Sequence, residues 1–178
     1  NIIEARRFDI DKKPHASFEK QTMYIANIFS SLFEISLRAS SDKTPDSAVQ
    51  CVRNYGYALG VANLLKAVPA LEMLGKNPIF LNLKINTKKN NLLGLETTNY
   101  YNSIIMLAQS GLDSIVKARE MHRISDFDCT ALVLSACSVE RILKRALRNP
   151  KLVQTNRIKI SRMYMRFSLI KSKLTKYI

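Results

Sequence analysis

The chain has 178 residues, 47% of them apolar, which is enough for a single domain over residues 1–178 with one buried core. Trp is absent, and Gly and Pro number only five each, so the chain lacks the many turn residues that an all-β domain needs. The composition therefore favours an all-α fold. The three cysteines, Cys51, Cys129 and Cys137, fit neither a disulfide framework nor the spacing of zinc ligands, which indicates a reducing compartment.

The net charge of +14 is concentrated near the C-terminus, where residues 141–178 hold 12 of the 28 Lys and Arg residues and no Asp or Glu. This segment predicts an anionic partner, and its charge alone does not distinguish phospholipid headgroups, RNA or an acidic protein surface. No apolar run approaches the roughly 20 residues that span a bilayer, so we expect a soluble or peripheral protein. The cations expected to contact the partner are Arg157, Lys159, Arg162, Arg166, Lys171 and Lys173.

The first two helices are predicted from apolar spacing and capping residues. Ser17 is a suitable N-cap for a helix that ends near Arg38. Thr44 is then the expected N-cap of a second helix, with Pro45 in its first position and an end near Ala67. In this second helix Gly56 and Gly60 lie four residues apart on one face, which predicts that another helix packs closely against them.

Beyond the second helix the pattern changes at Pro69, which is expected to end or kink it. Residues 75–99 lack a helical period and are predicted to be a loop, in which residues 81–86 alternate as a short strand would. A third helix is predicted from Tyr101 to Val116, and a fourth over residues 132–147 after a cap at Ser125. The last segment, 155–177, is predicted to be a basic C-terminal helix. We expect one stripe of it to belong to the core, with the cations solvated on its other face, and the residues of this stripe are Ile160, Tyr164, Phe167, Ile170 and Leu174.

Few residues offer independent chemistry. His15 and His122 are the two histidines, and neither has a Cys, Asp or Glu at metal-ligand spacing. Asp9 and Asp11 are two residues apart beside Arg6 and Arg7, which favours local capping and ion pairing over cation binding. The chain has no Gly-rich phosphate loop and no nucleophile elbow. Because it begins with Asn1, we expect it to start inside a longer protein.

Two segments resemble the squalene/phytoene synthase family. In the first, Asp9 and Ile10 match an Asp-Leu element, Ser17 and Glu19 match a helix start, and Tyr24 matches an aromatic position. The second resembles the long family helix that carries Gly-x-Ala, Asn-Ile-Leu-Arg-Asp and then Tyr-Leu-Pro. Its matching residues are Gly56, Ala58, Asn63, Leu64, Leu65, Lys66, Phe80 and Leu81. The resemblance covers residues 1 to about 81, implies an isoprenoid-synthase-like helical bundle and also marks Gly60 as a structural position.

The resemblance implies a metal site that this chain lacks. Active members of the family hold magnesium with two aspartate-rich motifs on facing helices, and the metal binds the substrate diphosphate. The second motif should read Asp-x-x-x-Asp from position 67, but this chain has Ala67 and Leu71 there, preceded by Lys66 where the family has Arg. Glu72 is one place late. We therefore expect no metal, no cofactor and no catalysis, while the first motif and its helices would lie upstream of Asn1.

The start of the chain and the Ala-x-Pro at positions 67–69 look most like one non-catalytic branch of the family, the mitochondrial assembly factor for respiratory complex I. The residues of this match are Ala5, Arg6, Arg7, Asp9, Asp11, Lys13, Pro14, Ala67 and Pro69. It implies a scaffold, accessory subunit or assembly factor that binds subunits of a large complex and anionic lipid such as cardiolipin, peripherally on the matrix side of the inner membrane. The alternatives are a prenyl-diphosphate synthase completed by residues outside the chain, and an RNA-binding mitochondrial ribosomal protein.

Overall fold

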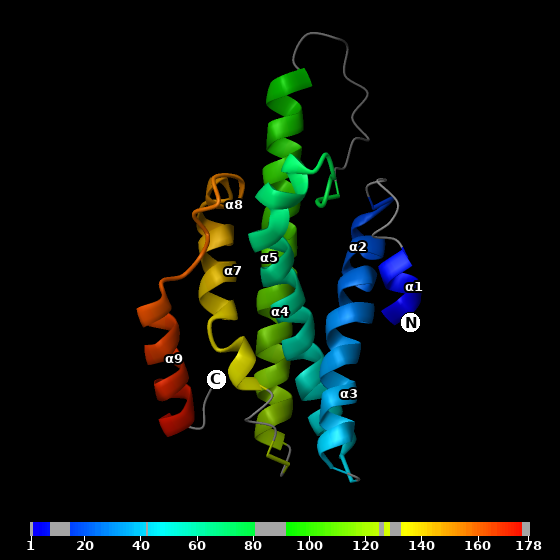
Figure 1. Ribbon diagram of the computed structural model, residues 1–178, viewed down its shortest axis with the longest axis vertical. Helices are drawn as coiled ribbons and strands as arrows, with labels where there is room; N and C mark the ends of the chain where they lie inside the picture. The colour runs from blue at the N-terminus through cyan, green and yellow to red at the C-terminus, as the bar shows by residue number, and fades with distance from the viewer. Residues whose placement is uncertain are drawn as a thin grey trace.

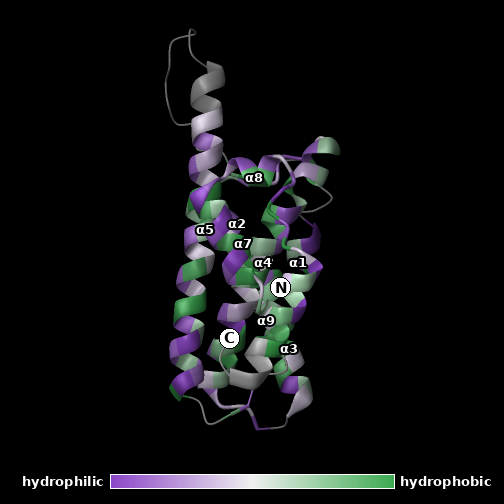
Figure 2. Cartoon of the chain, turned by 90° about the vertical axis from the view of Figure 1, so that its left-hand side faces the viewer, coloured by the Kyte–Doolittle hydropathy of each residue, from purple (hydrophilic) through white to green (hydrophobic). Residues whose placement is uncertain are grey.

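The computed structural model describes residues 2–7, 15–41, 43–80, 92–124, 127–128 and 133–175, with only the backbone given for residues 92–96, 135 and 171–175. Within these ranges the regular structure is entirely helical, so the expected all-α class is confirmed. The long helices run alternately up and down and pack side by side (Figure 1). Hydrophobic and hydrophilic residues are interspersed along the helices (Figure 2).

The first long rod consists of α2 (Phe18–Ile25), a π-helical turn η1 (Ala26–Ser30) and α3 (Ser31–Ser40). The predicted cap is present, because the Lys20 N–H donates to Ser17 Oγ at 3.1 Å. A wider π turn interrupts the helix that was predicted to be continuous. No single residue type marks such a turn in a sequence. The short helix α1 (Ile2–Arg7), which the sequence analysis did not predict, packs beside η1.

Helix α4 (Asp46–Met73) is the central column of the bundle and contacts α2, η1, α3, α5, α7 and α8. Of the apolar residues whose spacing predicts this helix, Val49, Val52, Tyr55 and Leu65 are buried and Leu59 is half-buried. Two expectations about its ends are wrong. Pro45 is the N-cap and not the first helical residue, and the helix continues past Ala67 and Pro69. A proline removes one hydrogen bond, and the buried Val68 beside it keeps this last part of α4 packed on the bundle.

Helix α5 (Leu92–Ile124) starts earlier than expected, so the predicted loop over 75–99 is wrong from residue 92 onward. The segment 92–100 contains Gly94 and two threonines, which hide a helical period although the chain is helical there. Of the apolar residues whose spacing predicts this helix, Ile104, Ala108 and Ile115 are buried, whereas Val116 is exposed. The possible strand at 81–86 lies outside the described residues.

The C-terminal part differs most from expectation. The predicted fourth helix is a 3-10 turn η2 (Leu134–Ala136) followed by α7 (Val139–Arg148), because Ser135, Cys137 and Ser138 are weak helix formers. Its expected cap, Ser125, lies outside the described residues. The continuous helix expected over 155–177 is also wrong. A short α8 (Lys151–Gln154) ends at a turn where Asn156 has a φ of 56°, an irregular stretch follows, and α9 (Arg162–Thr175) begins after it.

The two glycines of α4 lie where this helix approaches the π turn most closely. A Cβ atom at Gly56 would lie 2.7 Å from the main-chain oxygen of Phe29 and 3.1 Å from the Cβ of Phe33. A Cβ at Gly60 would lie 2.6 Å from side-chain atoms of Ile25 and Phe29. The close helix approach predicted from the spacing of these glycines is therefore confirmed.

Replacing Gly56 tests how much the fold depends on this approach. Since the Phe29 carbonyl belongs to the main chain and cannot rotate away, we expect Gly56→Ala to lower the free energy of unfolding by about 1–3 kcal/mol. Gly111→Ala is the matched control, because its nearest neighbour is a terminal methyl group of the Leu143 side chain, which can shift more easily than main chain, and alanine favours the helix. Urea unfolding followed by circular dichroism measures both, and equal stability of the two variants would contradict the prediction.

Candidate functional site

The positions expected to hold the second aspartate motif lie in the last three turns of α4. Ala67 and Leu71 are four residues apart, which places them on the same side of the helix, and both are half-buried. Neither side chain has an oxygen or nitrogen atom that could bind a metal. The residues present therefore do not fit the magnesium that the family motif implies.

Glu72, the nearest carboxylate in sequence, is turned toward another helix. The hydroxyl of Tyr100, from α5, donates a hydrogen bond to Glu72 Oε1 at 2.8 Å. Burial and the neighbouring Glu72 carboxylate together raise the pKa of Tyr100 well above its usual range. Glu72 thus links the end of α4 to α5. Its side chain leaves the helix on a different side from those of Ala67 and Leu71.

Lys66 places a positive charge next to the degenerate motif. Its side chain is half-buried, and burial lowers the pKa of the Lys66 ammonium, with a smaller contribution from the positive charge of Lys159. Two cations of distant parts of the sequence therefore lie near each other beside α4. Such a surface repels a divalent metal ion, whereas the family motif attracts one.

A groove of about 670 Å³ lies elsewhere on the bundle, between α2 with η1 on one side and α5 on the other. It includes Tyr57, which is ten residues, or about 15 Å along the helix axis, before Ala67. The lining is mixed in character, with apolar, hydroxyl, cationic and acidic side chains. The charged and apolar members are Phe18, Glu19, Met23, Ala26, Arg53, Asp113 and Lys117.

Helix α4 also lines this groove, and one polar contact joins it to α5 there. The Tyr57 hydroxyl lies 2.9 Å from Ser110 Oγ of α5, and burial raises the pKa of this tyrosine despite the hydrogen bond. Gln109 donates to Asp113 at 2.8 Å, so this carboxylate has a partner on its own helix. These groove residues could not be predicted from the sequence, because pairs such as Tyr57 and Ser110, 53 residues apart, leave no local signal.

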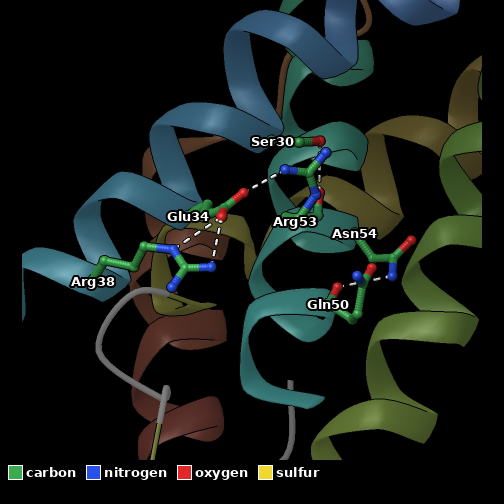
Figure 3. A network of polar contacts seen from close by, with 6 residues as sticks. All are labelled: Ser30, Glu34, Arg38, Gln50, Arg53 and Asn54. Atoms are coloured by element: carbon green, nitrogen blue, oxygen red, sulfur yellow. Dashed lines mark hydrogen bonds and ion pairs between the residues drawn. The ribbon is translucent and has the colours of Figure 1, made fainter. Parts of the chain in front are cut away.

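A polar network joins α3 and η1 to α4 at the edge of the groove (Figure 3). Ser30 Oγ donates to the Arg53 carbonyl at 2.8 Å, and the Arg53 guanidinium donates to Glu34. Arg38 donates to the other oxygen of Glu34 at 3.0 Å. Hydrogen bonds from Arg53 and Arg38 lower the pKa of Glu34. On the other side of the bundle Glu140 likewise pairs with Arg119 and Lys144.

The family-motif residues near the start of the chain do not converge on a metal site in the part of the chain that is described. Arg6 and Arg7 are exposed, and Arg7 pairs with Glu4 at 3.0 Å. Tyr24 is half-buried, with its ring 5.0 Å from that of His15. Asn63 is half-buried on α4. Asp9 and Asp11 lie outside the described residues.

Among the described residues no group of three or more His, Cys, Asp or Glu side chains could hold a metal ion. Nor does any helix in the described ranges have the length and apolar character needed to cross a membrane. Of the predicted partner-contacting cations, Arg157, Lys159, Arg162 and Arg166 are exposed. Lys171 and Lys173 lie in α9, but their side chains are outside the description.

The Glu34 network makes stability depend on pH. Because the pKa of Glu34 is lower in the folded chain than in the unfolded chain, its ion pairs stabilise the fold above about pH 5 and progressively less as the pH falls. We expect Glu34→Gln to lower the free energy of unfolding by about 1 kcal/mol at neutral pH and by progressively less as the pH is lowered to about 3. Urea titrations at both pH values measure it.

Glu4→Gln serves as the control for this measurement, since Glu4 and Arg7 form a largely exposed pair. Its stability should match that of the unaltered chain at both pH values. An effect of Glu34→Gln that persisted undiminished in acid would show that lost packing and not lost charge is responsible.

Most of the bundle matches a known protein family. The sequence model of squalene/phytoene synthase matches residues 1–164, while no curated protein and no solved structure matches the chain significantly. The match includes α4 with its two glycines and the degenerate motif, and it ends at the third residue of α9. The all-α bundle accordingly has the isoprenoid-synthase-like fold, and the chain belongs to the squalene/phytoene synthase family.

Proposed function

We propose that this chain is a non-catalytic squalene/phytoene synthase-like protein that serves as a scaffold, accessory subunit or assembly factor of a mitochondrial respiratory-chain complex, with complex I as the leading candidate. The observation that carries the proposal is the pair Ala67 and Leu71 at the positions of the second aspartate motif. In this proposal the protein acts peripherally on the matrix side of the inner membrane and needs no cofactor.

The chemical support comes from electrostatics. A prenyl diphosphate carries several negative charges, and metal ions bridge it to the carboxylates of an active synthase. Without carboxylates at positions 67 and 71 the bridge has nothing to bind on this helix. Glu72 accepts a hydrogen bond from Tyr100, and Glu34 and Glu140 are each paired with two cations, so these carboxylates are engaged elsewhere.

The partner part of the proposal rests on the resemblance and on the surface. The Ala-Arg-Arg and Ala-x-Pro sequences resemble the complex I assembly branch. The open groove between α2 and α5 carries charges of both signs, and Met23 at its edge is 60% exposed. A mixed surface of this kind, with an exposed methionine, suits contact with another protein better than enclosure of an apolar prenyl chain.

Isothermal titration calorimetry with magnesium and a non-hydrolysable prenyl diphosphate analogue tests the loss of chemistry. We expect no magnesium-dependent heat for this chain, since no carboxylate pair on α4 can hold the metal. An active synthase of the family provides the positive control. Tight binding of the analogue that required magnesium would refute the non-catalytic assignment and favour a synthase completed by residues outside the chain.

Separation of native mitochondrial complexes followed by mass spectrometry tests the partner. We expect this chain, tagged in its native cells, to migrate with subunits or assembly intermediates of complex I. The membranes are solubilised in a mild detergent, and the separation is run in parallel with and without nuclease treatment of the sample. Migration with ribosomal subunits that nuclease abolished would favour the RNA-binding alternative, and migration as a free monomer under every condition would contradict the scaffold.

A further inference from the structure

Helix α9 packs at the outer edge of the bundle, beside α7, through one of its sides (Figure 1). Ser168 Oγ donates to the Cys137 carbonyl at 3.1 Å, and the Arg141 guanidinium lies 3.7 Å from the centre of the Tyr164 ring. Tyr164 and Ser168 are four residues apart, so they share a face of the helix. This face determines which side of α9 points away from the protein.

The stretch before α9 is also anchored, which fixes where the helix begins. Arg145 of α7 donates to the main-chain oxygens of Arg157 at 2.6 Å and Lys159 at 2.9 Å. Between these two residues, Ile158 is completely buried. Helix α9 is therefore held in a defined orientation and does not hang from a free tail.

The outward side of α9 is apolar where the sequence analysis predicted core. Met163, Phe167 and Ile170 follow the i, i+4, i+7 spacing of one helical stripe, and their side chains are 70%, 67% and 57% exposed. The core expectation is therefore wrong for Phe167 and Ile170. Two other residues of the predicted stripe, Ile160 and Tyr164, are half-buried against the bundle, because the packed side of the helix is the one with Tyr164 and Ser168. Apolar side chains this exposed and this close together mark a surface that contacts something apolar.

Cations flank this apolar stripe. Arg162 and Arg166, also four residues apart, are exposed next to it, and no carboxylate among the described residues pairs with either. The chain from residue 141 onward contains no Asp or Glu at all. The surface thus combines exposed hydrocarbon with uncompensated positive charge. The side of the molecule on which α9 lies faces the reader in Figure 2.

We propose that α9 is an interfacial anchor that lies in the surface of an anionic phospholipid bilayer. Met163, Phe167 and Ile170 insert among the acyl chains, and Arg162 and Arg166 bind headgroup phosphates. RNA would account for the cations but not for the exposed stripe, whereas an anionic bilayer accounts for both. The inference rests on the proposed function only for the identity of the membrane, and most of α9 lies beyond the family match, which ends at residue 164.

Because the chain has no Trp, a single introduced indole reports directly on insertion. We expect the fluorescence of the Phe167→Trp variant to shift to shorter wavelength with phosphatidylcholine vesicles that contain cardiolipin, and not with phosphatidylcholine alone. The matched control is Ile35→Trp, since Ile35 on α3 is 55% exposed at the opposite edge of the bundle. Lipid-borne bromine atoms should quench the first indole and leave the second unchanged.

Co-sedimentation with the cardiolipin vesicles separates the apolar contribution from the charge. We expect Phe167→Ser to weaken binding about tenfold and Arg162→Gln with Arg166→Gln to weaken it about 30-fold. Ile170→Ser should also weaken binding, whereas Ile35→Ser, the same change at an equally exposed site, should leave it unaltered. Circular dichroism of each variant checks that the bundle remains folded.

The inference would be overturned if the indole at position 167 showed no shift with anionic vesicles. It would also be overturned if only the arginine substitutions mattered, because binding by charge alone is what RNA or an acidic protein predicts. Failure here is separate from failure of the proposed function. If the chain bound neither vesicles nor, with magnesium, a prenyl diphosphate analogue, the α9 inference would fail and the non-catalytic proposal would stand. The chain would then be held at its complex by protein contacts.

Discussion

The close approach of α4 to the π turn η1 is the contact on which the rest of the bundle depends. Gly56 and Gly60 have no side chain, and the main chain of Phe29 and the side chain of Ile25 occupy the space that a Cβ would need. This contact places the first rod against α4, and α4 in turn carries the buried surface for α5, α7 and α8. A side chain at either glycine would push the first rod away from α4 and disturb the packing between them.

In α4 the residues that hold the fold together are different from those that bind metal in active members of the family. Small residues and buried side chains that allow packing occur along most of its length, up to Val68, whereas its last two turns have an alanine and a leucine where an active synthase needs metal ligands. A bundle of this kind is stabilised mainly by apolar burial, and surface carboxylates add little to it. A chain can therefore lose its metal site and keep its structure, which leaves the folded surface available for other contacts.

The sequence predicted those features that depend on local chemistry. Ser17 caps its helix through its own side chain, and the apolar spacing of α4 correctly marks Val52, Tyr55 and Leu65 as buried. Features that depend on distant partners were not predictable. The bond between Tyr100 and Glu72, the Glu34 network and the π turn arise from how separate helices meet, and a single residue carries no record of its neighbour.

Helix α9 also shows what could not be predicted from the sequence. Apolar spacing establishes that a helix has two faces, but it does not establish which face meets the protein. Here Tyr164 and Ser168 make the internal contacts, and the larger apolar side chains, Phe167 among them, point outward. An apolar stripe that the bundle leaves uncovered, on a segment without acidic residues, is the arrangement that an anionic bilayer stabilises at no cost to the fold, because neither side of the helix has to change partners.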